Sequence, residues 1–463
     1  MGWRILIVAA LLFSGCAPQE RPPAVSDSIR QLANGARPSS VDEHVWADLK
    51  RFYEARAQAP AWVDDRDSLK ATAALRVLKS AADHGLDPAD YGEPDIARML
   101  ASNHDAEEST PEPTDLARLD VRMTTALLAL GRDVAIGRSS PQQLDPRWKK
   151  RRQPPDFAAL LERAANGESG WLASVQPAHP EYTALQHALQ WLRAQPAPND
   201  EQIRLLAINL ERWRWMPDDL GARHILVNVP AFHLAVRENG RAVLDMKVVV
   251  GESEPERRTP IFSADMRTIV FSPYWNVPDS IAEGETVPAL LRDPSFLKRN
   301  NIEILRKGKK GAEPIDAKAV DWDDEREVEG LLFRQRPGPQ NALGHVKFLL
   351  PNPFSVYLHD TPADSLFSRQ GRALSHGCVR LEQPEALAKY LLRDSPQWDD
   401  ERIQEAMHAE EEKPVGLKEK LPVHIVYFTA WPKDDGGFDT WPDVYGYDAQ
   451  QMSSRSGSSS KSS

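Results

Sequence analysis

Apolar residues at helical spacing dominate the first half of the chain. Between Thr114 and Ile136 they recur at steps of three and four residues, which places them in one stripe along a predicted helix. Similar stripes run through residues 68–85, where Gly85 ends the pattern, and through residues 201–215. Residues 41–216 are therefore predicted to be all-helical, with the Met and Trp side chains of these stripes in the core.

Near Arg223 the pattern changes from helical to strand-like. Residues 223–251 predict three strands, because Pro230 separates the first from the second and a turn at 238–240 closes a hairpin between the second and third. Further strands are predicted at 268–275, 346–351, 355–360 and 422–428, and a helix at 384–392. The fold class is therefore α+β and multidomain, with a helical N-terminal region before a mostly β domain.

A long polar insertion interrupts the β domain between residues 278 and 344. It mixes charge clusters with one helical stretch at 287–300. An insertion of this size inside a sheet domain is more often a lid or a binding loop than filler. We therefore expect it to cap a groove.

The N-terminus has the pattern of an export signal. Arg4 precedes an apolar run from Ile5 to Phe13, which is too short to span a bilayer as a mature helix. The stretch "FSGC" resembles a lipobox, so Cys16 is expected to carry lipid, and Ala17 is not the aspartate associated with inner-membrane retention. We expect a periplasmic protein held by the outer membrane; the alternative is an uncleaved inner-membrane signal anchor.

The composition of the remaining chain is that of an ordinary soluble protein. Its 463 residues suggest two or three domains, 41% are hydrophobic and 27% charged, and no later apolar run has membrane-spanning length. The formal net charge of -11 argues against nucleic acid as a partner. The basic runs at 147–152 and 306–311 are short, so solvated loops are the expectation there.

Cys378 lies in the stretch "LSHGCVRLE" and is the second of only two cysteines. If Cys16 is acylated, Cys378 has no partner within the chain, so it is either reactive or buried and inert. The surrounding turn could bring backbone amides near the thiol, where they favour a thiolate and can hold an oxyanion. A metal site of His359, His376 and Cys378 is conceivable from residue types, but no paired close spacing supports it.

The wider motif resembles a known family. His359 is followed by a spacer at 360–374 and then by Ser375, His376, Gly377, Cys378, the aliphatic Val379 and Arg380. This strongly resembles the signature of the L,D-transpeptidases, which have a YkuD-type catalytic domain. The segments 272–278, 334–362 and 366–382 are similar to the large YcbB-type subgroup, and 52–65 and 81–92 are similar to its helical scaffold.

The resemblance implies a cell-wall enzyme that needs no cofactor and is a target of carbapenems. The Cys378 thiolate would attack the carbonyl of the third residue of a tetrapeptide stem, normally meso-diaminopimelate, and release D-alanine. The side-chain amine of a second stem would resolve the thioester and form a cross-link. His359 matches the catalytic imidazole, and the carbonyl of Asp360 would orient it. The backbone amides around Gly377 and Cys378 are oxyanion-hole candidates.

Other residues receive supporting roles from the same resemblance. Ser375, His376 and Arg380 match the signature and are expected to shape the turn. Tyr274, Trp275 and Tyr357 are candidates for lining the substrate groove, although an aromatic pair in a strand is as often core. The small peptidoglycan-binding module usual in this subgroup is absent between the two helices at residues 189–210, so wall binding would rest on the groove, the scaffold and the lipid.

Several alternatives stay open. Water, a free D-amino acid or a protein lysine could resolve the same thioester, and a non-catalytic wall-binding lipoprotein is the alternative outside enzymology. The expected division of the chain is a signal at 1–15, a flexible tether at 16–40, a helical scaffold at 41–195, a linker and helix at 196–220, the catalytic domain at 221–430 with its lid at 278–344, and an extension at 431–463 with a disordered Ser-rich tail.

Overall fold

The computed structural model describes residues 24–63, 69–104, 111–149, 152–308, 311–322 and 324–459. The chain divides into two compact units. The first contains the chain up to Ala82 with Leu86–Ala135 and Pro154–Gln176, and the second contains Asp83–Gly85, Ile136–Gln153 and Pro177–Ser463. The predicted signal at 1–15 and the predicted lipidation of Cys16 lie outside the described residues.

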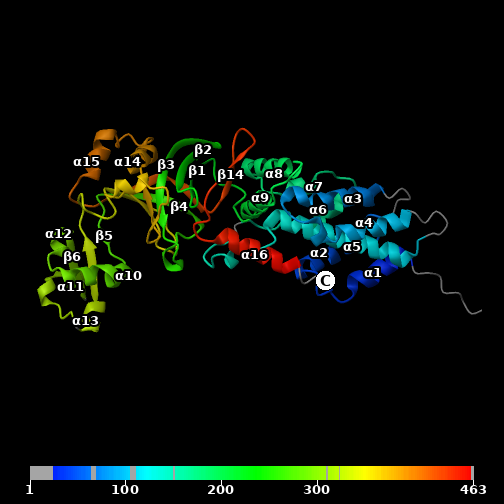
Figure 1. The fold of residues 1–463 in the computed structure, drawn as a ribbon, viewed down its shortest axis with the longest axis horizontal. Helices are drawn as coiled ribbons and strands as arrows, with labels where there is room; N and C mark the ends of the chain where they lie inside the picture. The colour runs from blue at the N-terminus through cyan, green and yellow to red at the C-terminus, as the bar shows by residue number, and fades with distance from the viewer. Residues whose placement is uncertain are drawn as a thin grey trace, which may run out of the picture. The chain divides into compact units, whose positions relative to one another are not determined.

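The first unit is a bundle of helices (Figure 1). Its helices are α1 Val25–Asn34, α2 Glu43–Ala55, α3 Leu69–Lys79, α4 Glu93–His104, α5 Pro113–Ile136, α6 Phe157–Ala165 and α7 Trp171–Val175. Asp120 of α5 lies at the centre, where it accepts hydrogen bonds from the Tyr53 hydroxyl at 2.7 Å and the Trp62 amide at 2.7 Å. Helix α1 falls inside the predicted tether, and because its Ile29 is fully buried, this part of the segment is helical rather than flexible.

The second unit is built on a closed barrel. Its strands are β1 Arg223–Asn228, β2 His233–Glu238, β3 Arg241–Gly251, β4 Phe262–Phe271, β9 Val346–Leu349, β10 Leu358–His359, β12 Val379–Leu381 and β13 Lys413–Val426. The sheet order β3-β12-β10-β9-β4-β13-β1-β2, with the added pairing of β2 and β3, closes a mixed ring of eight strands. The short strand β11 Ala373–Ser375 pairs with β3 from outside this ring.

Alternation along each strand fills the barrel. Ile225 and Val227 of β1 join the central apolar cluster, as do Val423 and Ile425 of β13. Leu226, between the first two, faces outward and belongs to a second cluster with helices α8 Pro180–Arg193 and α9 Asp200–Trp213. These two helices therefore pack on the barrel, so the predicted boundaries at 195 and 220 do not separate the compact units.

The insertion at 278–344, which we call the lid, forms its own small layer. Four strands pair in the order β5-β8-β6-β7, namely β5 Trp275–Asn276, β6 Ile302–Gly308, β7 Gly311–Ile315 and β8 Leu331–Gln335. Helices α10 Asp279–Ile281, α11 Val287–Arg292, α12 Phe296–Arg299 and α13 Glu325–Glu329 accompany them (Figure 1). Leu290, Ile304 and Phe333 share a separate apolar core, which makes the lid a folded element rather than a loose loop.

Helices α14 Pro384–Leu392 and α15 Asp400–Met407 follow the barrel strand that carries the motif, as the sequence predicted for α14. The C-terminal extension then forms the hairpin β14 Ala430–Pro432 and β15 Phe438–Thr440, and helix α16 Tyr447–Ser459. The tail from residue 453 was expected to be disordered, but it is helical as far as Ser459 because α16 continues through it.

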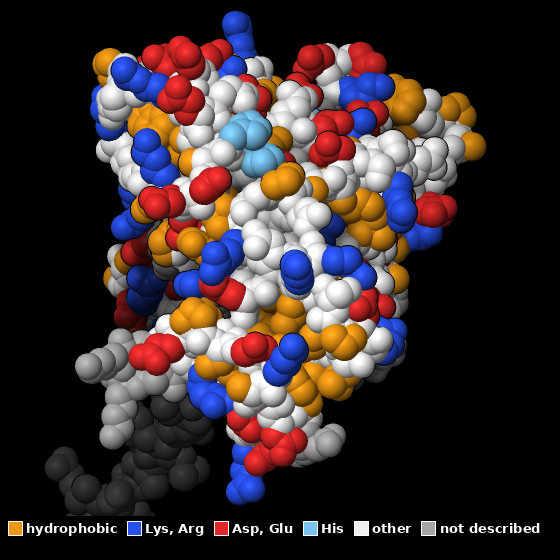
Figure 2. Space-filling view, turned by 90° about the vertical axis from the view of Figure 1, so that its left-hand side faces the viewer, with side chains coloured by type: hydrophobic (Ala, Val, Ile, Leu, Met, Phe, Trp, Pro, Cys, Tyr) orange, Lys and Arg blue, Asp and Glu red, His pale blue; other side chains and the backbone are white. Residues whose placement is uncertain are grey.

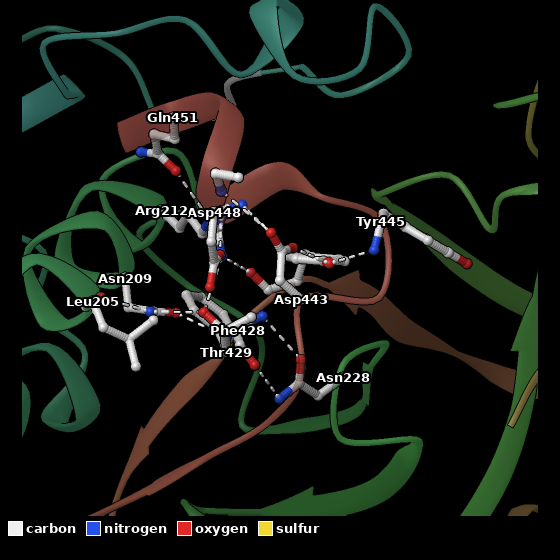
Figure 3. A network of polar contacts seen from close by, with 12 residues as sticks. Leu205, Asn209, Arg212, Asn228, Phe428, Thr429, Asp443, Tyr445, Asp448 and Gln451 are labelled. Carbon is white, nitrogen blue, oxygen red and sulfur yellow. Dashed lines mark hydrogen bonds and ion pairs between the residues drawn. The ribbon is translucent and has the colours of Figure 1, made fainter. Parts of the chain in front are cut away.

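A buried polar network holds the C-terminal extension against the barrel (Figure 3). Arg212 of α9 is fully buried and forms an ion pair with Asp448 at 2.7 Å. The Tyr427 hydroxyl donates to Asp443 at 2.6 Å and accepts from the backbone amide of Tyr445 at 2.8 Å. Since buried charges are costly without partners, this network fixes the path of residues 443–448.

Candidate active site

The pairing of β10 with β12 brings the two candidate catalytic residues together. The strands run parallel, with Leu358 opposite Val379 and His359 opposite Arg380. Leu358 and Val379 are fully buried inside the barrel. Because side chains alternate along a strand, the outer face presents the neighbours of these two residues. These neighbours are Tyr357, His359, Cys378 and Arg380.

His359 is a neutral imidazole in this setting. Its side chain is 4% exposed, and Nδ1 lies 2.5 Å from the backbone carbonyl of Asp360. A carbonyl can only accept, so Nδ1 carries the proton and Nε2 keeps a free lone pair. Burial, reinforced by the positive charge of Arg380, lowers the pKa of His359 to about 3. The side chain can therefore act as a general base at neutral pH.

Cys378 is a free, half-buried thiol. Its Sγ lies 3.9 Å from the carbonyl oxygen of Ser355. Burial raises the pKa of Cys378 to about 11, although hydrogen bonds from Tyr357 and the charge of Arg380 act in the opposite direction. The expectation that the turn favours a thiolate is therefore not met in the resting site, where burial outweighs these contacts. His359, which lies on the same face of the paired strands, is the neutral base available to take the proton as the thiol reacts.

The turn before Cys378 is fixed by Ser375. The Ser375 hydroxyl donates to the carbonyl of Cys378 at 2.6 Å and accepts from the amide of Gly377 at 3.1 Å. Gly377 has φ of 120°, which only glycine adopts readily. Its amide is thus already engaged, so the proposed oxyanion role does not suit Gly377, and the amide of Cys378 is the better candidate in this turn.

Residues far from the motif hold the same turn from behind. The hydroxyl of Thr259 donates to the carbonyl of Gly377 at 2.8 Å and accepts from the amide of Gly251 at 2.8 Å. The hydroxyl of Tyr445 donates to the carbonyl of Gly251 at 2.8 Å and accepts from the amide of Thr259 at 3.1 Å. Sequence reasoning missed Thr259 and Tyr445, since nothing local to either residue indicates this contact.

Asp360 is positioned by a close backbone approach. Its carboxylate accepts hydrogen bonds from the amides of His345 and Thr361, both at 2.7 Å. Gly344 has φ of 59°, and a Cβ there would lie 2.3 Å from the carboxylate. This glycine therefore lets Asp360 hold the loop whose carbonyl orients His359. A glycine at the end of the predicted insertion was the signal available in the sequence.

His376 bonds to the lid. Its Nε2 lies 2.8 Å from Oε1 of Glu285 in the lid, so it links the turn to the lid. Among the described residues, no group of three His, Cys, Asp or Glu side chains is arranged to hold a metal ion.

A cavity of about 330 Å³ lies between the lid and the barrel. Trp275 and Glu285 line it from the lid side, and Thr361 and Arg380 from the barrel side. The Nε atom of Arg380 is buried there and has no hydrogen-bond partner among the described residues. Trp275 lines this cavity, and its contact with substrate stays a prediction. Tyr274 is not among the residues that line this cavity; its ring packs on the guanidinium of Arg334 at 4.6 Å.

The fold and the site define a closed β-barrel domain that pairs a thiol with a neutral imidazole beneath a lid. A model of the scaffold domain matches residues 47–189, and a model of the L,D-transpeptidase catalytic domain matches residues 222–425. A Haemophilus influenzae protein assigned to the L,D-transpeptidases is 34% identical over 433 residues, which cover 87% of this chain and 78% of that protein. The chain belongs to the L,D-transpeptidase family.

Two solved structures align with less of the chain. The L,D-transpeptidase from Mycobacterium smegmatis shares 15% identity with a TM-score of 0.22, over 44% of this chain and 58% of that protein. L,D-transpeptidase 1 of Mycobacterium tuberculosis shares 14% identity with a TM-score of 0.18, over 44% and 61%. This chain thus covers less than two thirds of either protein. None of the helices in the described part of the chain has the length and apolar character needed to cross a membrane.

Proposed function

We propose that the protein cross-links peptidoglycan stems between two third residues through a thioester on Cys378. The observation that carries this proposal is the outer face of β10 and β12, which presents a thiol, a neutral imidazole and Arg380, and Arg380 also lines the lid cavity. A binding protein would have no need of a nucleophile with a base beside it. The donor is the tetrapeptide stem that the family implies.

The resting protonation states decide the order of proton transfers. Nε2 of His359 takes the thiol proton of Cys378 while Sγ bonds to the carbonyl carbon of the third residue. The tetrahedral intermediate collapses to a thioester as the C–N bond breaks, and the imidazolium returns the proton to the leaving amine of D-alanine. An incoming amine then attacks the thioester, gives its proton to His359 and forms the new amide, and the proton passes back to the sulfur.

The lid is an argument that the thioester is transferred to an amine rather than hydrolysed. Its contact through Glu285 and His376 places a folded layer beside the thiol. Such a layer can exclude water until an amine arrives, because closing a site removes competing nucleophiles. A carboxypeptidase or an exchange enzyme acting on the same stems is the alternative outcome.

The test is product analysis on purified enzyme. Disaccharide-tetrapeptides are incubated with the wild type and Cys378→Ala, and the products are resolved by liquid chromatography and mass spectrometry. We expect dimers joined through two third residues, with loss of D-alanine, from the wild type only. Tripeptide monomers without dimers would show a carboxypeptidase. A carbapenem adduct on Cys378→Ala would refute the assignment of the nucleophile.

The lipid anchor is a second part of the proposal, supported by "FSGC" ending at Cys16. A diacylglyceryl group on Cys16 would keep the enzyme at the outer membrane, facing the periplasm. Labelling cells with a clickable palmitate and comparing the wild type with Cys16→Ala tests this. An unlabelled wild type in the soluble fraction would contradict it.

A further inference from the structure

A second cavity, of about 390 Å³, is lined by residues of β4 and by the loop at 351–354. We call it the basic cleft. It shares no lining residue with the lid cavity. Its lining residues are Arg147, Lys149, Phe262, Ser263, Ala264, Asp265, Arg267, Pro351, Asn352, Pro353 and Phe354.

Two independent contacts place the basic cleft beside the thiol. Phe354 lines the cleft and directly precedes Ser355, whose carbonyl oxygen lies 3.9 Å from Sγ of Cys378. On the other side, Arg147 donates to the carbonyl of Arg258 at 3.4 Å, and a Cβ on Gly377 would lie 3.7 Å from that oxygen. The lining residues Phe354 and Arg147 are therefore neighbours of the loop at Ser355 and of the segment that packs on the turn at Gly377.

The charge of the cleft is positive. Arg147, Lys149 and Arg267 contribute three cations to the lining, against Asp265 alone. Asp265 is shared, since it lies 2.8 Å from Lys420 and 3.7 Å from Arg267. On the face seen in Figure 2, acidic and basic side chains are interspersed, and the chain as a whole has a formal net charge of -11.

Part of the cleft is built rigidly. Asp145 holds the guanidinium of Arg147 with two close contacts, of 2.9 Å to Nε and 2.7 Å to Nη2. Phe262 and Phe354 meet edge to face with ring centroids 5.3 Å apart and form an apolar wall. Two exposed cations, Lys149 and Arg267, beside an aromatic wall suit a peptide that carries several carboxylates.

We infer that the basic cleft binds the acceptor: the carboxylate-bearing peptide stem that delivers the amine to the thioester. The inference rests on the proposed function and adds a site to it. Transfer requires two peptides at one sulfur atom. The donor carbonyl must lie against Cys378 on the face that carries His359 and Arg380, which leaves the cleft beyond Ser355 for the second stem. Lys149 and Arg267 attract its carboxylates, while Arg147, paired with Asp145, contributes to the wall of the cleft.

The first experiment isolates this site by filling the other. The full-length protein is acylated on Cys378 with a carbapenem, checked by intact mass, and titrated with a disaccharide-tripeptide, which cannot serve as donor. We expect saturable binding that weakens as salt is raised, and at least about tenfold weaker binding for Lys149→Glu/Arg267→Glu. Arg241→Glu/Lys298→Glu reverses two exposed cations outside the cleft and serves as the matched control.

The second experiment measures transfer of the acyl group to the acceptor. With a fixed donor, the acceptor KM for dimer formation should rise at least about tenfold in Lys149→Glu/Arg267→Glu, while the rate of carbapenem acylation stays at the wild-type value. The tripeptide share of the products should rise accordingly. Equal tripeptide binding by the cleft and control variants, or an unchanged acceptor KM, would overturn the inference.

Failure of the proposed function has a different signature. If the wild type forms no carbapenem adduct and no dimers, the thioester chemistry itself is wrong. In that case the thiol is blocked with iodoacetamide and the tripeptide titration is repeated. Binding that depends on Lys149 and Arg267 would still support a peptide site in the cleft, and absence of binding would remove it.

Discussion

At the scale of single residues, the site pairs two neutral groups. Burial raises the pKa of Cys378 to about 11 and lowers the pKa of His359 to about 3, so both shifts disfavour the charged form. A thiolate–imidazolium pair would require the opposite shifts. The thiol therefore stays protonated in the resting site, and the proposed attack must transfer its proton to Nε2 as the bond to sulfur forms.

The first prediction concerns alkylation of Cys378 by the neutral reagent iodoacetamide. Only the thiolate reacts, so the rate should rise about tenfold per pH unit between pH 7 and 10, without a plateau in that range. Arg380→Met should slow alkylation at each pH, because the charge of Arg380 lowers the pKa of the thiol. Intact-mass time courses measure the rates. A rate independent of pH above about 6 would indicate an ion pair instead.

The second prediction concerns stability in acid. A buried histidine with a pKa of about 3 binds its proton only in the unfolded chain between that value and 6.5, so stability falls as pH falls through this window. From pH 6.5 to 4.5, His359 should contribute a loss of about 2 kcal/mol. His84 has a similarly low pKa and adds to the effect.

Urea unfolding of the wild type and His359→Gln at pH 7 and 4.5 tests this. The variant should lose less stability than the wild type on acidification, and His84→Gln should behave alike. Because the chain has two compact units, barrel and helical signals are followed separately. Parallel acid profiles for the wild type and His359→Gln would contradict the assignment of a neutral imidazole.

At the scale of elements, local pattern predicted most of the second unit. Alternation predicted β1, β2 and β3, and the hairpin turn lies where Asn239 takes a left-handed conformation with φ of 48°. The motif indicated Cys378 and His359. The two-residue strand β10 carries little periodicity of its own, and its partners are set by the closed ring, so the shared face of the site became visible only in the structure.

The supporting residues could not be predicted for a related reason. Thr259, Gly344 and Tyr445 act through contacts with backbone groups distant in sequence, and the residue type alone gives no sign of such contacts. The packing of α8 and α9 on the barrel likewise depends on the outward face of β1, which alternation identifies as a face without naming its partner.

The lid gives the third prediction. Glu285 lies in a π-helical segment, Ala282–Thr286, a geometry often found at functional sites. Glu285→Ala removes the contact with His376 and should raise the hydrolysed share of the acyl-enzyme a few-fold, while Glu283→Ala, an exposed neighbour, should not. The ratio of tripeptide to dimer measures this. An unchanged ratio in Glu285→Ala would show that the contact does not retain the lid.

At the scale of the whole molecule, the C-terminal extension is part of the site. A series of contacts connects this extension to the motif. Arg212 pairs with Asp448, and the nearby Tyr445 hydrogen-bonds to Gly251 and Thr259. Thr259 in turn holds the turn at Gly377. The motif thus depends on residues that follow the barrel. Deleting them should affect the chemistry as well as the stability.

The fourth prediction separates these two effects. Tyr445→Phe removes the hydroxyl that bonds Gly251 and Thr259, and should lower the acylation rate about tenfold with stability reduced by about 1 kcal/mol. Tyr447→Phe removes a buried hydroxyl bonded to Asp145 at 3.0 Å and should match the stability loss without the kinetic one. Carbapenem acylation and thermal unfolding measure both. Equal acylation rates in the two variants would make Tyr445 purely structural.

The parallel pairing of β1 with β13 has a consequence for the order of events in the cell. Ile225 lies opposite Val423, so the ring cannot close until the last strand of the barrel has been made and pairs with the first. Contacts this distant in sequence form slowly, and a ribosome makes the intervening chain over many seconds. The growing polypeptide therefore carries Cys378 as an unassembled thiol, and the site around it forms only after the whole domain has been made and folded.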